Sequence, residues 1–243
     1  MIYSPTQLKT RFRTTLVLFT LAIAIWKTPF LTNLVYQIDS LIYFVCNKLI
    51  GSSMIWTKFV GFINHKHENW LNLVFMLTIN FLMIASSKPY ARKKIFWQII
   101  YFWFFFQFVI YLTHFVFQDT LAIRRVSPSN IFIDTHNSIS TILMSDSIKE
   151  ASVTSFPAGH TLVAIYWCLF SLSLKPGVIL QRCIFLVTGL LCINRLLTGA
   201  HWGTDVIFTI NLGFFFHYVS CHPFFYGFSD LTTPNNVAFI NKP

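Results

Sequence analysis

Apolar positions along this chain gather into long runs separated by short polar segments, and the pattern predicts helices that cross a membrane. A spanning helix needs about 17 to 25 mainly apolar residues. Six runs fit this need: 14–35, 70–87, 95–117, 159–175, 177–194 and 205–223. A seventh run, 38–62, is interrupted by Asp39 and two lysines while its apolar positions keep helical spacing. That pattern predicts one or two amphipathic helices lying in the membrane interface.

The amino-acid composition points to the same fold class. Of the 243 residues, 55% are hydrophobic and only 11% are charged, with a mean hydropathy of +0.60. Soluble domains carry about 25% charged residues. We therefore predict an all-α polytopic membrane protein with six transmembrane helices and one interfacial segment, built as a single integral membrane domain over residues 1–243. The polar tail, 229–243, is expected to be loosely ordered.

The distribution of charge predicts the orientation in the membrane. Three short segments, 1–13, 88–94 and 175–182, hold nine Lys and Arg residues and no Asp or Glu. Cytoplasmic loops of membrane proteins are enriched in Lys and Arg. The N-terminus is therefore expected in the cytoplasm, with the opposite helix ends outside. The net charge of +10 then reflects membrane topology, and no basic soluble face indicates a nucleic-acid partner.

Three polar clusters fall at the outer ends of the predicted helices, at 118–128, 155–160 and 195–205. In the third cluster, His201 and Asp205 are four residues apart and so share one helix face. A carboxylate there can accept a hydrogen bond from one imidazole nitrogen and leave the other nitrogen free to attack. Arg195 precedes His201 by six residues, and its planar guanidinium suits phosphate oxygens.

The other two clusters add a proton donor and more positive charge. Gly159 and His160 open a predicted helix, where backbone N–H groups attract an anion, and His160 can protonate a leaving oxygen. Arg124 and Arg125 lie at the edge of an apolar bundle, which is costly unless they meet an anion. A nucleophile, its orienting acid, a proton donor and cations together indicate phosphoryl transfer, which requires no metal or cofactor here.

Each of these groups of residues also has a non-catalytic interpretation. His201 and Asp205 alone would suit a structural hydrogen bond at a helix start, and Arg124 and Arg125 would suit interfacial snorkelling. The loop from His65 to Glu68 offers a metal site as an alternative, but two histidines in a polar loop are more often simply solvated, so no metal is predicted. Three clusters in order on one membrane face favour the catalytic interpretation.

The motifs resemble those of a known family. The spacing Arg195-x5-His201-x3-Asp205, preceded by Pro157-x-Gly159-His160, is similar to the type 2 phosphatidic acid phosphatase superfamily. Its members are six-helix membrane enzymes that work through a phosphohistidine. The resemblance implies His201 as nucleophile, Asp205 as its partner, His160 as acid, and Arg125 and Arg195 as phosphate ligands.

Two positions depart from the superfamily pattern. Gln118 stands where a lysine is usual, and Ala158 stands where a serine is usual. Both departures resemble one branch, the lipid A 1-diphosphate synthases, and so does the segment 38–44. This likeness implies a bacterial inner-membrane enzyme with a periplasmic active site. Its donor would be undecaprenyl diphosphate and its acceptor a phosphorylated glycolipid, with Arg124, Gln118 and Gly159 as further phosphate contacts.

Two other functions stay open at this point. With water as acceptor, the same residues would make an undecaprenyl-diphosphate or lipid phosphate phosphatase, because both reactions share every catalytic group. A non-catalytic lipid carrier or channel subunit with the same fold is a third hypothesis, and it predicts that His201→Ala leaves function intact. The complete set of His, Arg and Asp residues argues against the carrier.

Overall fold

The computed structural model describes residues 5–65, 68–152 and 154–220, and this part of the chain is built from helices without a strand. The longer elements are α1 (Pro5–Lys27), α2 (Pro29–Asn47), α3 (Met54–Ile63), α4 (Glu68–Ser86), α5 (Pro89–His114), α8 (Gly159–Ser173), α9 (Val178–Leu197) and α10 (Gly203–Ser220). The short elements between α5 and α8 are η1 (Phe115–Thr120), α6 (Pro128–Ile131), η2 (Ile133–Thr135) and α7 (Ile139–Leu143). The predicted all-α class is confirmed.

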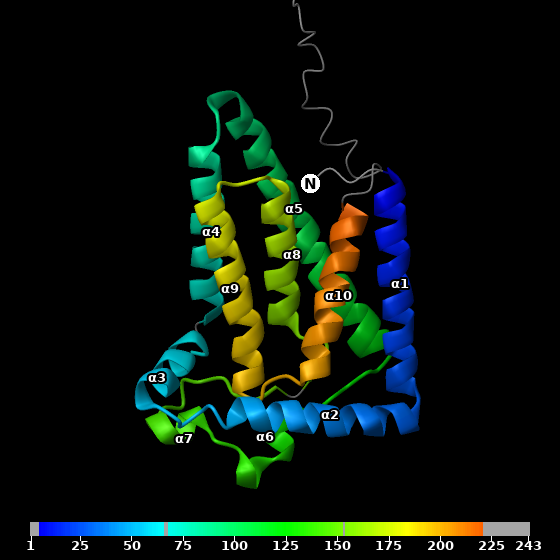
Figure 1. Ribbon diagram of the computed structural model, residues 1–243, viewed down its shortest axis with the longest axis vertical. Helices are drawn as coiled ribbons and strands as arrows, with labels where there is room; N and C mark the ends of the chain where they lie inside the picture. The colour runs from blue at the N-terminus through cyan, green and yellow to red at the C-terminus, as the bar shows by residue number, and fades with distance from the viewer. Residues whose placement is uncertain (1–4, 66–67, 153, 221–243) are drawn as a thin grey trace, which may run out of the picture.

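The long helices form a bundle with a cover across one end. Figure 1 shows α1, α4, α5, α8, α9 and α10 running along the long axis, with α2 lying across their lower ends. The short helices α3, α6 and α7 lie at that same end, whereas the α4–α5 and α8–α9 connections lie at the other. The basic connections 88–94 and 175–182 therefore share one end of the bundle with the start of α1, as the charge pattern predicts.

The first predicted span, 14–35, is wrong at its C-terminal end because Pro29 begins a new helix. Proline favours the first helical position and biases the residue before it toward extended backbone. Thr28 is extended, with φ −105° and ψ 109°. The segments Lys9–Lys27 and Pro29–Asn47 meet at 99°. The predicted interfacial segment 38–62 consequently divides between the end of α2 and all of α3.

Length and hydropathy identify fewer spans than the sequence pattern predicted. Among the described residues, Pro89–Thr120 and Val178–Leu197 are long and apolar enough to cross a membrane, and the bent α1–α2 pair would make a third if it acts as one span. Trp70–Ser86 and Gly159–Ser173 are apolar but shorter than the roughly 20 residues of a typical span. Six spans stay a prediction.

The core of the bundle is aromatic and closely packed around α8. The ring centroids of Phe102 and Phe170 are 4.3 Å apart, which joins α5 to α8. Gly213 brings α10 against α8, since an added Cβ there would lie 2.7 Å from Cγ2 of Ile165. Small residues permit such close helix approaches in membrane proteins. The helices that carry the second and third clusters thus form one packed unit.

Candidate active site

The polar clusters of the sequence meet where α8, α9 and α10 end above α2 (Figure 1). Arg195 lies in the last turn of α9 and Asp205 in the first turn of α10, with His201 in the connection between them. His160 lies in the first turn of α8. Four residues from two of the three sequence clusters therefore gather at one end of the bundle.

The connection between α9 and α10 is fixed by backbone hydrogen bonds. The N–H groups of Ala200 and His201 both donate to the carbonyl of Arg195, at 3.1 and 3.2 Å. Gly199 supplies the left-handed conformation, φ +68°, that this type of helix end requires. The six-residue spacing between Arg195 and His201 is thereby set by the turn itself.

His201 is buried and held in one tautomer by a backbone carbonyl. Its Nδ1 lies 2.5 Å from the carbonyl oxygen of Ser155. A carbonyl can only accept, so Nδ1 carries the proton and Nε2 keeps its lone pair. Burial, followed by the charge of Arg195, lowers the pKa of His201 to about 3. The imidazole is therefore neutral near pH 7, as a nitrogen nucleophile must be.

The predicted direct pairing of His201 with Asp205 is wrong for this structure. The carboxylate of Asp205 accepts hydrogen bonds from the Ser155 hydroxyl at 2.8 Å and from the Trp202 N–H at 3.2 Å. The second bond closes the start of α10 as an acidic residue in a capping box does. Asp205 instead reaches His201 through Ser155, whose hydroxyl it binds and whose carbonyl orients the imidazole.

Arg125 joins the first cluster to the third. Its Nη1 donates to Asp205 at 2.5 Å and to the Thr204 hydroxyl at 3.2 Å, and its Nη2 donates to Asp39 at 2.8 Å. Among the described residues, these bonds leave the Nε–H and one Nη2–H of the guanidinium without an acceptor. Arg125 can therefore be held in place and still donate to an anion.

The guanidinium of Arg125 also stacks on two indole rings. Its central carbon lies 4.2 Å from the ring centroid of Trp26 and 5.1 Å from that of Trp202. Stacking of this kind is attractive and fixes the plane of the guanidinium. The neighbouring Arg124 is exposed and forms no hydrogen bond or ion pair with the residues that the structure describes. Of this predicted pair, the structure brings Arg125 to the cluster and leaves Arg124 outside it.

Arg195 connects α9 to α8. It is 2% exposed, and its Nη2 lies 2.9 Å from Nε2 of His160. Because arginine only donates, Nε2 of His160 accepts this bond. The other terminal nitrogen donates to the side-chain oxygen of Asn64 at 3.3 Å and to the Lys149 carbonyl at 3.4 Å. One predicted phosphate ligand and the predicted acid are thus in direct contact.

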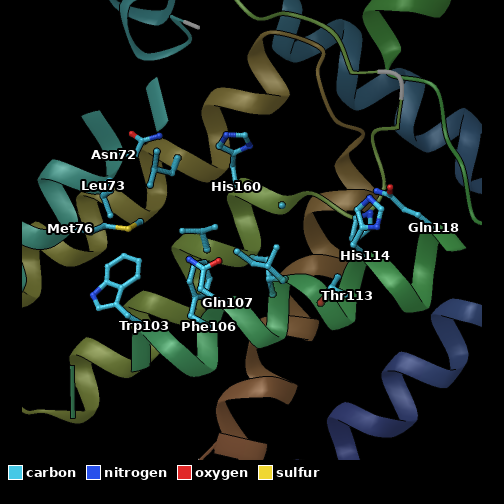
Figure 2. A pocket seen from close by; sticks show the side chains of 16 residues that line it. Asn72, Leu73, Met76, Trp103, Phe106, Gln107, Thr113, His114, Gln118 and His160 are labelled. Atoms are coloured by element: carbon cyan, nitrogen blue, oxygen red, sulfur yellow. The ribbon is translucent and has the colours of Figure 1, made fainter. Parts of the chain in front are cut away.

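A cavity of about 500 Å³ lies beside His160 (Figure 2). Gln118 and Gly159 also line it, so these two candidates share a cavity with the predicted acid. A Cβ added at Gly159 would meet no atom within 4 Å, which leaves open space next to the start of α8. The remaining wall is mostly apolar: Asn72, Leu73, Met76, Trp103, Phe106, Gln107, Ile110, Thr113, His114, Pro157, Leu162, Val163 and Leu191.

The structure adds residues that motif reasoning missed. Asp39 and Asn64 are fully buried, and each contacts one of the arginines of the cluster. One feature of the sequence points to Asp39, because it is a carboxylate that interrupts an apolar run. No sequence feature points to Asn64, since a single amide at the end of an apolar segment is common. Both contacts depend on the fold of α2 and α3.

The comparisons with known proteins agree with the motifs. Residues 108–228 match the PAP2 superfamily. This matched segment begins within α5 and includes every residue of the cluster except Asp39, Asn64 and Trp26. PAP2 superfamily members are generally phosphatases or phosphotransferases, and the match indicates activity on lipid phosphates. The chain matches no curated protein and no solved structure.

Two remaining expectations fall on residues that the structure does not describe. Lys66 and His67 of the His65–Glu68 loop lie outside the described residues, as does the tail 229–243. Within the part of the chain that the structure describes, no group of three or more His, Cys, Asp or Glu side chains is arranged to hold a metal ion.

Proposed function

We propose that this protein transfers the terminal phosphate of undecaprenyl diphosphate to lipid A 1-phosphate through a phosphohistidine on His201. The observation that carries the proposal is the pairing of His201 Nδ1 with the Ser155 carbonyl, which leaves Nε2 as a lone-pair donor. Arg195 is close enough to depress the pKa of this imidazole and contacts His160 directly. The PAP2 match supports phosphoryl transfer, and the Gln118 and Ala158 departures support the choice of transferase.

In the first half-reaction, Nε2 of His201 attacks the terminal phosphorus of the donor. An N–P bond forms, the bridging P–O bond breaks, and undecaprenyl phosphate leaves with a proton from His160. When the donor binds, its phosphate replaces His160 as the acceptor of the hydrogen bond from Arg195. The negative charge of the phosphate then favours the protonated imidazole of His160. Arg195 and the two remaining N–H groups of Arg125 stabilise the charge on the transferring group.

In the second half-reaction, an oxygen of lipid A 1-phosphate attacks the phosphohistidine. The N–P bond breaks, a new P–O bond completes lipid A 1-diphosphate, and His160 takes back the proton when the attacking phosphate carries one. Asp205 holds Ser155 in place throughout, so that the Ser155 carbonyl can stabilise positive charge on the imidazole.

The cavity and the charge pattern support a membrane arrangement of this reaction. The mostly apolar cavity begins at His160, which we assign to the leaving oxygen, and so suits the first isoprene units of the donor chain. The basic connections lie at the opposite end of the bundle from the cluster (Figure 1). We therefore propose a cytoplasmic N-terminus and a periplasmic site in a bacterial inner membrane.

The test is phosphate transfer by the purified full-length protein in detergent. Undecaprenyl diphosphate labelled in its terminal phosphate is supplied with and without lipid A to the wild type, to His201→Ala and to His217→Gln. His217 is a matched control because it is a buried histidine near the C-terminal end of α10, the helix that follows His201. Label should pass to lipid A with wild type and His217→Gln, and His201→Ala should lose at least about 10³-fold.

The same assay separates the alternatives. Phosphate released equally with and without lipid A would make the protein a phosphatase and overturn the choice of acceptor. Turnover retained by His201→Ala would overturn the phosphohistidine. An acid-labile label on wild-type protein, absent from His201→Ala, would support the covalent intermediate.

A further inference from the structure

The α2–α3 layer, residues 29–63 together with Asn64 at the end of α3, carries two fully buried polar side chains at the cluster. Asp39 of α2 and Asn64 both have 0% exposure. A buried carboxylate costs several kcal/mol unless it is paired and hydrogen-bonded. The partners of these two side chains therefore indicate why they are buried there.

The carboxylate of Asp39 binds both Arg125 and the start of α10. Its Oδ2 accepts from Nη2 of Arg125 at 2.8 Å and from the Thr204 hydroxyl at 2.5 Å, while its Oδ1 accepts from the Thr204 N–H at 2.8 Å. Thr204 in turn accepts from Nη1 of Arg125 at 3.2 Å. This closed set of bonds fixes where the guanidinium lies relative to α10.

Asn64 binds Arg195 in the way that Asp39 binds Arg125. Its side-chain oxygen accepts from Nη1 of Arg195 at 3.3 Å. Its amide nitrogen donates to the Val60 carbonyl at 2.8 Å and to the side-chain oxygen of Asn194. Its backbone carbonyl accepts from the backbone N–H of Lys149 at 2.9 Å. The amide orientation is thereby set from three sides, and the guanidinium of Arg195 is guided by it.

We propose that the α2–α3 layer positions both phosphate-binding arginines, with Asp39 holding Arg125 and Asn64 holding Arg195. Both positioning residues lie outside residues 108–228, so the PAP2 match does not cover them. A free arginine side chain loses rotamer entropy when it binds an anion. Holding the guanidinium before the anion arrives removes part of that cost. The proposal rests on the proposed function for the roles of the two arginines.

The same layer offers a matched control that separates positioning of the arginines from a purely structural role. Asn47 of α2 is also buried, at 2% exposure, and ties α2 to Asn137 and to the Leu197 carbonyl. No hydrogen bond joins Asn47 to Arg125 or Arg195. Asn47→Ala therefore loosens the layer without releasing either arginine directly.

The experiment compares Asp39→Asn, Asn64→Ala and Asn47→Ala in the purified full-length protein. Readouts are kcat and KM with undecaprenyl diphosphate, Tm, and the shift in Tm that orthovanadate produces. Asp39→Asn keeps an acceptor oxygen and removes the charge. We expect Asp39→Asn and Asn64→Ala to lower kcat/KM about 10- to 100-fold and to reduce the vanadate shift, because hydrogen bonds to charged groups are worth about 1.5–3 kcal/mol. Asn47→Ala should lower Tm comparably while staying within about threefold of wild-type kcat/KM.

A double-mutant cycle makes the assignment specific. In an Arg195→Lys background, Asn64→Ala should lose most of its effect on the vanadate shift, whereas Asp39→Asn should keep its effect, because only residues that share a contact couple strongly. Equal losses in all three variants, or full additivity of Asn64→Ala with Arg195→Lys, would overturn positioning.

The vanadate shift needs no turnover. A wild type that binds vanadate but transfers no phosphate would therefore sink the proposed function and still test the positioning of the arginines. Wild type without any vanadate shift and without turnover would overturn both, because the arginines would then bind no phosphate-like anion.

Discussion

At the end of the bundle where the clusters meet, α8 and the α9–α10 connection contribute His160 and His201, while the α2–α3 layer contributes Asp39 and Asn64. The two histidines come from motifs with fixed spacing, at positions that the local turns dictate. The two buried polar residues come from segments without a recognisable motif. Their partners are the arginines rather than the predicted nucleophile or acid.

This difference separates two kinds of information in one site. Reactive atoms need a particular residue at a particular turn, so they leave a short pattern in the sequence. Positioning groups need only a carboxylate or an amide at the correct point in space, and any segment that the fold brings there can supply it. Arg125 contacts both kinds of residue, because its guanidinium binds Asp205 of the motif and Asp39 of the α2–α3 layer.

Arg125→Ala should therefore have the largest effect of the changes considered, on stability and activity together. The substitution leaves two carboxylates, Asp39 and Asp205, both 0% exposed, without their shared counter-charge. Breaking a buried ion pair costs about 3–5 kcal/mol. At about 2–4 °C per kcal/mol for a chain of this size, Tm should fall by about 10 °C. Thermal unfolding in detergent measures it.

Activity should fall with stability at this position. Transfer by Arg125→Ala should drop at least about 10²-fold, as expected for loss of a charged phosphate contact. If the alanine variant does not fold, Arg125→Lys serves instead, because it keeps the charge and loses the planar fork. Wild-type turnover by Arg125→Lys would show that geometry at this position is unimportant and would remove the link between the two regions.

Ser155→Ala should have an intermediate effect, because it removes one of the two hydrogen bonds that link Asp205 to His201 through Ser155. The hydroxyl that donates to Asp205 is lost, while the carbonyl that orients His201 remains. We expect transfer to fall about tenfold, within the range for one hydrogen bond to a charged group. The matched control is Ser127→Ala, a fully buried serine that bonds to Ser152 and contacts Ser129. Equal losses in both variants would mean that Asp205 does not act through Ser155.

Much of this site could be predicted from the sequence because its turns are local. The spacing between Arg195 and His201 corresponds to a helix end with Gly199, and Gly159-His160 corresponds to a helix start. The all-α class followed from apolar runs and low charge. Each of these inferences uses contacts between residues close in the chain, which is where periodicity and spacing are informative.

The rest depended on long-range contacts. Helical spacing predicted that Asp205 binds His201. In the structure, the backbone carbonyl of Ser155 binds the imidazole instead. Arg124 and Arg125 look equivalent as adjacent arginines, and the long-range partners of Arg125, Trp26 and Asp39 among them, distinguish the two. The bend at Pro29 could have been anticipated, since a proline inside an apolar run favours a helix boundary.

Glu150→Gln tests the loop that covers the α2–α3 layer, and its effect should be smaller and confined to stability. Burial alone would raise the pKa of Glu150, but hydrogen bonds from the Ser138 hydroxyl and the Ser140 N–H, together with the nearby His136, whose Nε2 lies 3.7 Å from the carboxylate, lower it below its usual range. A lowered folded-state pKa gives stability that is present above the unfolded pKa of about 4.3 and lost as pH falls through the folded value. We expect Glu150→Gln to lower Tm by about 2–4 °C at pH 7, with the difference from wild type shrinking below about pH 4.

Thermal unfolding from pH 7 to pH 3 measures this pH dependence. Glu150 contacts neither arginine, so transfer should stay within about twofold of wild type once the protein is folded. A difference in Tm that persists at pH 3 would show that the carboxylate charge is not the source of the stabilisation.

Arg124→Ala should have the smallest effect and calibrates the first prediction. Arg124 is adjacent to Arg125, yet its side chain is exposed and makes no hydrogen bond or ion pair with the described part of the chain. Exposed charges contribute roughly 0–1 kcal/mol, so Tm should stay within about 2 °C and transfer within about twofold of wild type. A loss as large as that of Arg125→Ala would mean that Arg124 contacts the phosphate in the substrate complex. The guanidinium that the α2–α3 layer holds would then not be the one that the reaction needs.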